Sequence, residues 1–171
     1  RELERGGLGV DAPDVEHALR GRAAARAGAR AAARAGGHLP RVRGPANAFR
    51  RRHRLYGPFV LQAGRIAAGE GCEELLEYYQ HYLHEGGDAC LVLMGTKLLP
   101  LPDDPGVRFG GILPDEERAH SLEAATVVVL PSPDDRQLML ALEGLSVGTP
   151  VLVNARSTTV VQHCLRSQGG L

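Results

Sequence analysis

The sequence predicts an α/β domain in which a parallel sheet is covered by helices on both faces. From residue 59 onward, short apolar runs alternate with stretches of helical periodicity, which is the pattern of successive βαβ units. The run at residues 90–95 is apolar without a break, as a strand buried on both faces requires. Ligands of such sheets bind beyond the carboxyl ends of the strands, so the residues that follow each strand are the candidates for a functional site.

The strands are recognised as apolar runs that end at Gly, Pro or a polar turn. We expect them at residues 59–63, 90–95, 107–109, 126–130 and 150–153. The helices are recognised by apolar residues three and four apart, as with Leu75, Leu76, Tyr79 and Leu83 on one face. We expect them at residues 73–83, 115–125, 138–148 and 158–166.

Residues 1–54 differ in composition from the rest, and we expect an interdomain segment there, partly helical or disordered, ahead of a domain at 55–171. Arginine is concentrated in this segment, and Arg22, Arg26, Arg30 and Arg34 recur every four residues in an Ala-rich stretch. On a helix they would form one basic stripe, suited to phosphates or a membrane surface. Because no large apolar residue lies opposite the stripe, we favour a solvated linker helix or simple compositional bias.

Composition also limits the class of partner and the location. The residues after position 54 are acidic overall, which argues against a nucleic-acid binder. No apolar run reaches 18 residues, so only a peripheral contact with the cytoplasmic membrane face is left open. Three cysteines, odd in number and far apart, are typical of reduced thiols in a cytoplasmic protein. Because the sequence starts at Arg1 and ends in a loop-like stretch, we expect a fragment of a longer chain, truncated at its C-terminus.

Three segments that follow strands carry candidate chemistry. Residues 64–71 are Gly-rich and contain Arg65, which can bind phosphate oxygens bidentately, although a surface arginine in an ordinary turn fits as well. Residues 131–144 place Asp134 and Asp135 at a helix start, where caps are common. They also place Glu143 on an otherwise apolar helix, where either ribose hydroxyls or solvent would be its partner. Residues 148–154 are a helix stop and a turn, structural on their own.

Together these segments resemble glycosyltransferase family 4, the retaining enzymes with the GT-B fold. The C-terminal domain of that family opens with G-R-[IL]-x-x-x-K-G and later carries P-S-x-x-E-x-x-x-x-x-x-x-E-A-x-A-x-G-x-P-V. The matching residues here are Gly64-Arg65-Ile66 with Gly69-Glu70-Gly71, then Pro131-Ser132, Asp135, Glu143 and Gly148-Thr149-Pro150-Val151. Residues 7–11 resemble the turn that joins the two domains of the family, and residues 107–113 its short strand before the base-binding loop. The resemblance implies a Rossmann-like parallel sheet with helices on both faces, one half of a GT-B fold.

The resemblance also implies a role for each matching position. Arg65, with Gly64 beside it, would bind the donor diphosphate next to Glu70. Asp135 would lie near the hydroxyls of the donor sugar and Glu143 would hold those of the ribose, so that Arg65, Asp135 and Glu143 form the implied catalytic set. Backbone amides at a helix start would support the leaving phosphate, and a loop would receive the base. The implied residues are Arg136, Gln137, Leu138 and Met139 for the phosphate and Gly111, Ile112 and Leu113 for the base.

The implied reaction is transfer of a sugar from a UDP- or GDP-sugar by a retaining hexosyltransferase. No metal or cofactor is expected, because arginine and a helix end stabilise the departing diphosphate. The acceptor, a glycan, a lipid or a small molecule, would bind a missing N-terminal domain, so this chain alone is expected to be inactive.

Two positions depart from the family pattern. The lysine that partners the arginine is Glu70 here, which puts an anion where a cation faces the diphosphate. At an effective dielectric constant near 20, a pair of unit charges 4 Å apart is worth about 4 kcal/mol, so the exchange is costly. The first glutamate of the pair is Asp135 here, which shortens its reach. Arg136 is a candidate replacement for the lysine, and a degenerate, non-catalytic domain with a scaffold or regulatory binding role is the alternative function.

Overall fold

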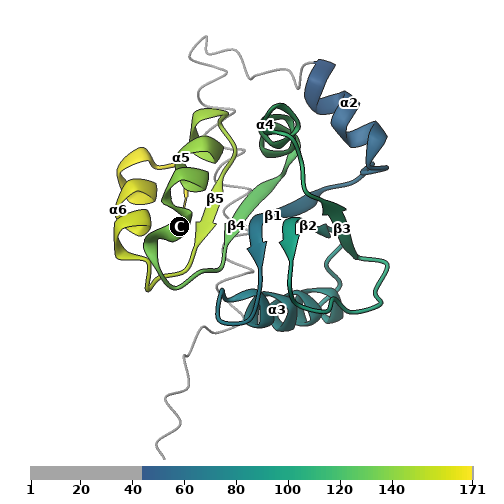
Figure 1. Ribbon diagram of the computed structural model, residues 1–171, viewed down its shortest axis with the longest axis horizontal. Coiled ribbons are helices and arrows are strands. Elements are labelled where there is room, and N and C mark those ends of the chain that lie inside the picture. The colour runs from purple at the N-terminus through teal and green to yellow at the C-terminus, as the bar shows by residue number, and fades with distance from the viewer. Residues whose placement is uncertain (1–43, 171) are drawn as a thin grey trace, which may run out of the picture. The chain divides into compact units, whose positions relative to one another are not determined.

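The computed structural model describes residues 44–170, which form a five-stranded parallel sheet with helices packed on it (Figure 1). The strands are β1 (Phe59–Ile66), β2 (Cys90–Lys97), β3 (Val107–Gly111), β4 (Val127–Leu130) and β5 (Val151–Val153). The helices are α2 (Gly44–Arg52), α3 (Cys72–His84), α4 (Asp115–Ala124), the short 3-10 helix η1 (Asp135–Gln137), α5 (Leu138–Ser146) and α6 (Thr158–Ser167). The strand order is β3-β2-β1-β4-β5, so the chain returns to the middle of the sheet when it passes from β3 to β4.

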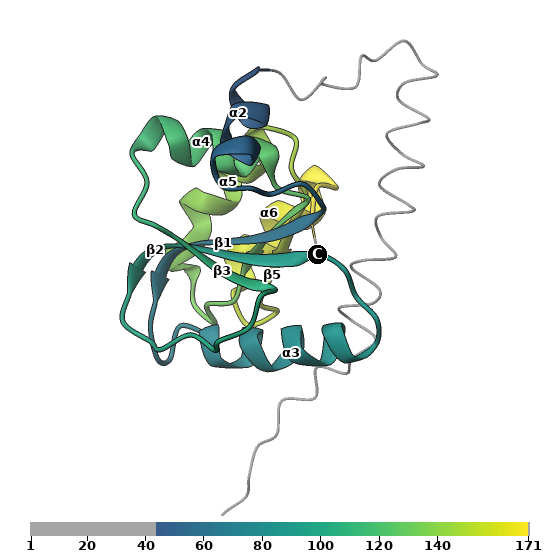
Figure 2. The same cartoon turned by 90° about the vertical axis from the view of Figure 1, so that its right-hand side faces the viewer.

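Two separate apolar clusters hold the layers together, one on each face of the sheet. The larger cluster joins the sheet to α2, α4, α5 and α6, and includes Phe49, Leu61 and Leu122. The smaller cluster joins the sheet to α3 through Ile66, Tyr79 and Leu93. Figure 2 shows α3 on one face, with α2, α4 and α5 on the other. The prediction of a parallel sheet covered on both faces is therefore confirmed.

The alternation of side chains along β1 determines the face on which each candidate residue lies. Leu61 and Ala63 belong to the larger cluster and Ile66 to the smaller one, so odd-numbered residues of β1 face α4 and α5. Arg65 is exposed at the carboxyl end of this strand, on the same face as Leu61 and Ala63.

The predicted strands and helices are all present, but β1, β2 and β3 run further than their predicted segments. Strand β1 continues for three residues past residue 63, because Gly64, Arg65 and Ile66 pair with Gly95, Thr96 and Lys97 of β2. Glycine and charged residues interrupt the apolar pattern without interrupting a ladder of main-chain hydrogen bonds. Arg65 is therefore the penultimate residue of a strand and does not belong to the turn that follows it.

Helix α2 was not expected as an element of the packed domain. It lies within the segment 1–54, yet Ala46 and Phe49 are buried in the larger cluster together with Leu55. Arg50 fastens the helix to the end of α4 by donating two hydrogen bonds to the carbonyl oxygen of Ala124, at 3.1 and 2.6 Å. Packing against the sheet domain thus begins before residue 55. The stripe from Arg22 to Arg34 and the turn-like residues 7–11 lie outside the described residues.

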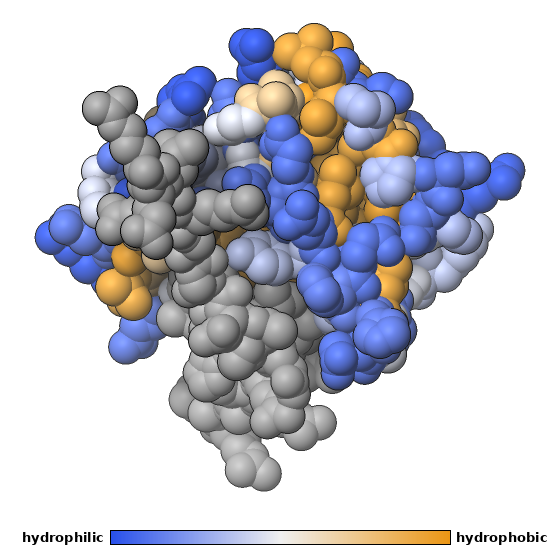
Figure 3. Space-filling model, turned by 90° about the horizontal axis from the view of Figure 1, so that it is seen from below, coloured by the Kyte–Doolittle hydropathy of each residue, from blue (hydrophilic) through white to orange (hydrophobic). Residues whose placement is uncertain are grey.

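Hydrophilic side chains dominate the surface seen from the α3 side, with a band of apolar residues between them (Figure 3). Several leucines near this face are only half-buried, because they pack against the smaller cluster from its rim; they are Leu75, Leu76, Leu83, Leu99 and Leu101. Within residues 44–170, no helix combines the length and the apolar character needed to cross a lipid bilayer.

One polar side chain lies inside the sheet region without a hydrogen-bond partner. Gln62 of β1 is fully buried, and neither its Nε2 nor its Oε1 has a partner among the described residues. Removing a buried polar group that makes no hydrogen bond saves its cost of desolvation, which is about 1–3 kcal/mol.

We expect Gln62→Met to raise the free energy of unfolding by about 1–2 kcal/mol, because methionine follows the same unbranched path without polar atoms. Urea denaturation of the chain measures this change. Gln62→Ala is the control, since it removes the same polar atoms but leaves a cavity and should not stabilise the protein. Equal or lower stability of Gln62→Met would show that the amide has a partner.

Candidate functional site

The candidate site lies where the strand order reverses. Strand β1 pairs with β2 on one side and with β4 on the other. The loops that follow β1 and β4 therefore begin at neighbouring positions on the carboxyl edge of the sheet. Open parallel sheets bind ligands at such a point. The two loops touch, because a Cβ atom added to Gly71 would lie 2.1 Å from the carbonyl oxygen of Pro131. The fold therefore brings together residues 64–71 and 131–139, which lie apart in the sequence.

Glu70 is the centre of a polar network between these two loops. Its side chain is only 12% exposed, and Arg136 Nη1 lies 3.1 Å from its Oε1. The Ser132 hydroxyl lies within hydrogen-bond distance of both Glu70 Oε2, at 3.3 Å, and Asp134 Oδ1, at 3.0 Å. Its single proton can serve one of these carboxylates at a time. Residue 70 is thus an inward-facing carboxylate that is already paired with a cation.

Asp134 provides a second carboxylate to the same network. Its Oδ1 accepts a hydrogen bond from the main-chain N–H of Arg136 at 3.0 Å, and its Oδ2 is paired with Arg136 Nε. The hydrogen bond from the Arg136 main chain is the largest of the effects that lower the pKa of Asp134. The side-chain hydrogen bond between the Arg136 guanidinium and Asp134 is the largest of the effects that raise the pKa of Arg136. The first of the backbone amides expected to support a leaving phosphate is therefore occupied by a carboxylate of the chain itself.

Asp135 faces a different element. Its Oδ1 accepts hydrogen bonds from the Ser157 hydroxyl at 2.7 Å and from the main-chain N–H of Thr159 at 3.2 Å. Hydrogen bonds from the side chains of Thr159 and Ser157, with that from Thr159 the larger, lower the pKa of Asp135. The carboxylate of Asp135 thus binds the first turn of α6, whereas Asp134 is the N-cap of η1.

Glu143 forms an ion pair across two helices. Its Oε2 lies 2.9 Å from Nη1 of Arg118, which is on α4. Both side chains are partly open to solvent, with exposed fractions of 32% for Glu143 and 41% for Arg118. The Glu143 carboxylate is therefore partly exposed to solvent, and it is already paired with a cation. A ribose diol at this position would have to share the carboxylate with Arg118.

The other predicted residues surround this region without forming polar contacts to it. The Arg65 side chain forms no hydrogen bond or ion pair within residues 44–170. Ile112 and Met139 are exposed, at 74% and 66%, while Leu113 and Leu138 pack against the larger cluster. Gly111, the last residue of β3, adopts a φ of 79°. Gln137 accepts a hydrogen bond from the main-chain N–H of Ser132 at 3.2 Å and so closes its own loop.

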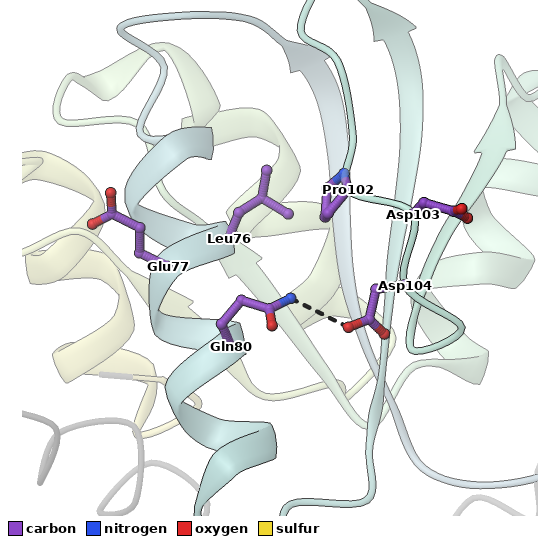
Figure 4. Close-up of a pocket in the computed structure, with 6 residues that line it drawn as sticks. All are labelled: Leu76, Glu77, Gln80, Pro102, Asp103 and Asp104. Carbon is purple, nitrogen blue, oxygen red and sulfur yellow. Dashed lines mark hydrogen bonds between the residues drawn. The ribbon is translucent and has the colours of Figure 1, made fainter.

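A shallow groove among the described residues lies elsewhere. It has a volume of about 430 Å3 and opens between α3 and the loop from β2 to β3 (Figure 4). Gln80 Nε2 lies 3.4 Å from Asp104 Oδ2 across it. A second groove, of about 250 Å3, lies between α2 and α4. Neither groove contains a residue predicted to bind the donor. The first groove is lined by three carboxylates, which disfavours an anionic ligand. Its lining residues are Leu76, Glu77, Gln80, Pro102, Asp103 and Asp104.

Three residues of the site were not assigned a site role by sequence reasoning, namely Arg118, Ser132 and Asp134. Ser132 and Asp134 lie within the quoted motif segment, so their proximity to Asp135 was a usable signal. Arg118 lies on another helix, and only the packing of α4 beside α5 brings it to Glu143. Among residues 44–170, no three His, Cys, Asp or Glu side chains gather as metal ligands.

Comparisons with known proteins identify the fold. No protein-family model matches the sequence, and no curated protein does. The glycosyltransferase WaaG, involved in lipopolysaccharide biosynthesis, has a TM-score of 0.56 at 16% identity, covering 80% of this chain and 38% of WaaG. Sucrose-phosphate synthase from Thermosynechococcus elongatus has a TM-score of 0.51 at 24% identity, covering 68% of this chain and 33% of the synthase.

A third similar structure is a single domain. It is the C-terminal domain of LpcC, a glycosyl transferase group 1 family protein from Francisella tularensis, with a TM-score of 0.50 at 20% identity. The match covers 62% of this chain and 63% of that domain, whereas the chain spans about a third of the length of WaaG and of the synthase. Residues 44–170 thus have the Rossmann-like fold of the C-terminal domain of GT-B glycosyltransferases.

Proposed function

We propose that this chain is the nucleotide-sugar-binding half of a two-domain glycosyltransferase. The observation that carries the proposal is the contact between the two motif loops at the point where the strand order reverses, between Gly71 and Pro131. Arg65 lies on the face of the sheet that α5 covers, and Glu143 projects from α5 itself. A donor spanning this face would meet the guanidinium with its diphosphate and the carboxylate with its ribose.

The proposed reaction requires stabilisation of charge on a departing nucleoside diphosphate. Fixed positive groups beside the leaving oxygen lower that barrier, and Arg65 is the unpaired cation available for this task among the described residues of the two loops. The exposed side chains of Ile112 and Met139 are apolar surfaces against which a base can lie. The acceptor would bind a further domain, so the proposed role of this chain is to hold the donor.

Donor binding can be tested by calorimetric titration of the 171-residue chain with UDP and with GDP. We expect one of the two to bind, and we expect Arg65→Ala to weaken it by about ten- to a hundredfold, as loss of a charge-assisted hydrogen-bond pair does. Arg166→Ala is the matched control, because it removes an equal charge from the exposed end of α6. Unchanged affinity in Arg65→Ala would refute the assigned phosphate site.

A second candidate is a non-catalytic domain of the same fold, with a scaffold or regulatory role. The observation that favours it is the inward-facing Glu70, which is paired with Arg136 and accompanied by Asp134 where a diphosphate would be expected. This candidate predicts that neither UDP nor GDP binds at millimolar concentration and that neither raises the Tm of the protein. Binding that depends on Arg65 would exclude it.

A further inference from the structure

We infer that Arg136 supplies the second cation for the donor's pyrophosphate, that Glu70 positions it, and that Asp134 occupies its place until the pyrophosphate displaces that carboxylate. This inference rests on the proposed function and names the residues that would replace the missing lysine. It is derived from the different burial of the two carboxylates that Arg136 contacts.

Two nitrogens of the Arg136 guanidinium contact carboxylates, and the third does not. Its Nη1 pairs with Glu70 and its Nε with Asp134, whereas Nη2 has no hydrogen-bond partner within residues 44–170. The side chain is 67% exposed and belongs to η1, which follows β4. A planar guanidinium with free N–H groups at a loop edge can bind two oxygens of a phosphate at once.

The two carboxylates that contact Arg136, those of Glu70 and Asp134, differ in their exposure to solvent. Glu70 is 12% exposed and also meets the Ser132 hydroxyl, in a turn that is pressed against Pro131 at Gly71. It is therefore a fixed anchor that directs the guanidinium. The side chain of Asp134 is 39% exposed, so it can rotate into solvent, where water replaces its hydrogen bonds.

Asp134 also makes the contacts that an anionic ligand would make. Its two oxygens bind the Arg136 guanidinium, the main-chain N–H of Arg136 and the Ser132 hydroxyl. A pyrophosphate carries more charge than one carboxylate and more acceptor oxygens, so it can replace Asp134 on the same donors. With Arg65 on the neighbouring strand, the site would then present two cations to the diphosphate.

The inference is tested by titrating the 171-residue chain with UDP, UMP and inorganic pyrophosphate. We expect Arg136→Ala to weaken UDP and pyrophosphate by about tenfold or more, and UMP by much less. We expect Asp134→Asn to tighten UDP by roughly two- to fivefold, since asparagine keeps the cap and removes the competing charge. In the double variant Asp134→Asn/Arg136→Ala the gain should vanish, because it acts through Arg136.

Two sets of control variants distinguish the positioning of Arg136 by Glu70 from the effect of removing a negative charge. Asp103→Asn removes an equal charge from the groove beside α3 and should leave UDP affinity unchanged. Glu70→Ala should weaken UDP although it removes an anion, and Glu70→Gln, which keeps an acceptor for Arg136, should restore most of the affinity. Tighter binding by Glu70→Ala would overturn the positioning role, because charge removal alone would then explain the result.

The outcomes distinguish this inference from the proposed function. If UDP binds in an Arg65-dependent manner but Arg136→Ala binds it equally well, the inference is overturned and the proposed function stands. If neither the wild-type chain nor Asp134→Asn binds any of the three ligands while their Tm values show that both are folded, both proposals are overturned.

Discussion

Replacing Gly71 with alanine is expected to lower the free energy of unfolding by about 2–5 kcal/mol. Gly71 has a φ of 75°, where a Cβ atom costs about 1–2 kcal/mol. The added Cβ would also lie 2.1 Å from the carbonyl oxygen of Pro131 and 2.7 Å from its carbonyl carbon. Both atoms belong to the main chain and cannot rotate away, so the two loops must separate, at a cost of about 1–3 kcal/mol.

Gly69 provides a matched control two residues earlier in the same turn. Its φ is 76°, almost the same as that of Gly71, but a Cβ atom there would meet nothing within 4 Å. Gly69→Ala should therefore cost about 1–2 kcal/mol from the backbone alone. Urea denaturation of the three proteins measures the difference between the two variants, which is the cost of pushing the loops apart. Equal stability of the two variants would mean that the loops do not touch in solution.

The contact at Gly71 also explains why Glu70 lies where it does. Glu70 precedes the contact and Ser132 follows it on the other loop, so closure of the two loops brings the carboxylate to the hydroxyl. A destabilised Gly71→Ala protein should consequently lose the pairing of Glu70 with Arg136 as well. The fold and the charge pattern of the candidate site are connected through one glycine.

The arrangement of strands and helices could be predicted from periodicity because each element has its own local signature. Residues 90–95 are apolar throughout, and α3 places its leucines at helical spacing. What periodicity could not predict is where a ladder of main-chain hydrogen bonds stops. The last residues of β1 are a glycine, an arginine and an isoleucine, and they stay in the sheet because β2 continues beside them. The packing of helix α2 on the sheet domain was not predicted, because only two of its residues, Ala46 and Phe49, are buried.

The candidate site was predictable in its positions but not in its partners. The sequence predicted Asp135 at a helix start and Glu143 inside the helix that follows, and the structure has Asp135 as the first residue of η1 and Glu143 in α5. Their partners, Ser157 and Arg118, come from α6 and α4, and no local pattern in the sequence indicates that these helices lie beside α5. A carboxylate at position 70, where the family that the sequence resembles has a lysine, could be predicted from the sequence, whereas the pairing of Glu70 with Arg136 depends on the contact between the loops.

Glycine at position 95 is expected to be even less replaceable than Gly71. Gly95 lies in β2 opposite Gly64 of β1 and has a φ of 127°, a conformation that other residues rarely adopt. A Cβ atom there would lie 1.9 Å from the carbonyl oxygen of Gly64, within the ladder that carries Arg65 to the carboxyl edge. We expect Gly95→Ala to cost about 3 kcal/mol or more, since strain and a clash with the main chain add together.

Gly64→Ala separates these two contributions, because the partner glycine has nearly the same φ, 121°, with nothing within 4 Å of an added Cβ atom. Strain alone should then cost Gly64→Ala about 1–3 kcal/mol, less than Gly95→Ala in parallel denaturation experiments. The motif resemblance drew attention to Gly64 as the glycine next to the ligand, but the steric requirement lies on β2. If Gly64→Ala proved the more damaging of the two, the close approach of the strands at this pair would be wrong, and with it the position of Arg65.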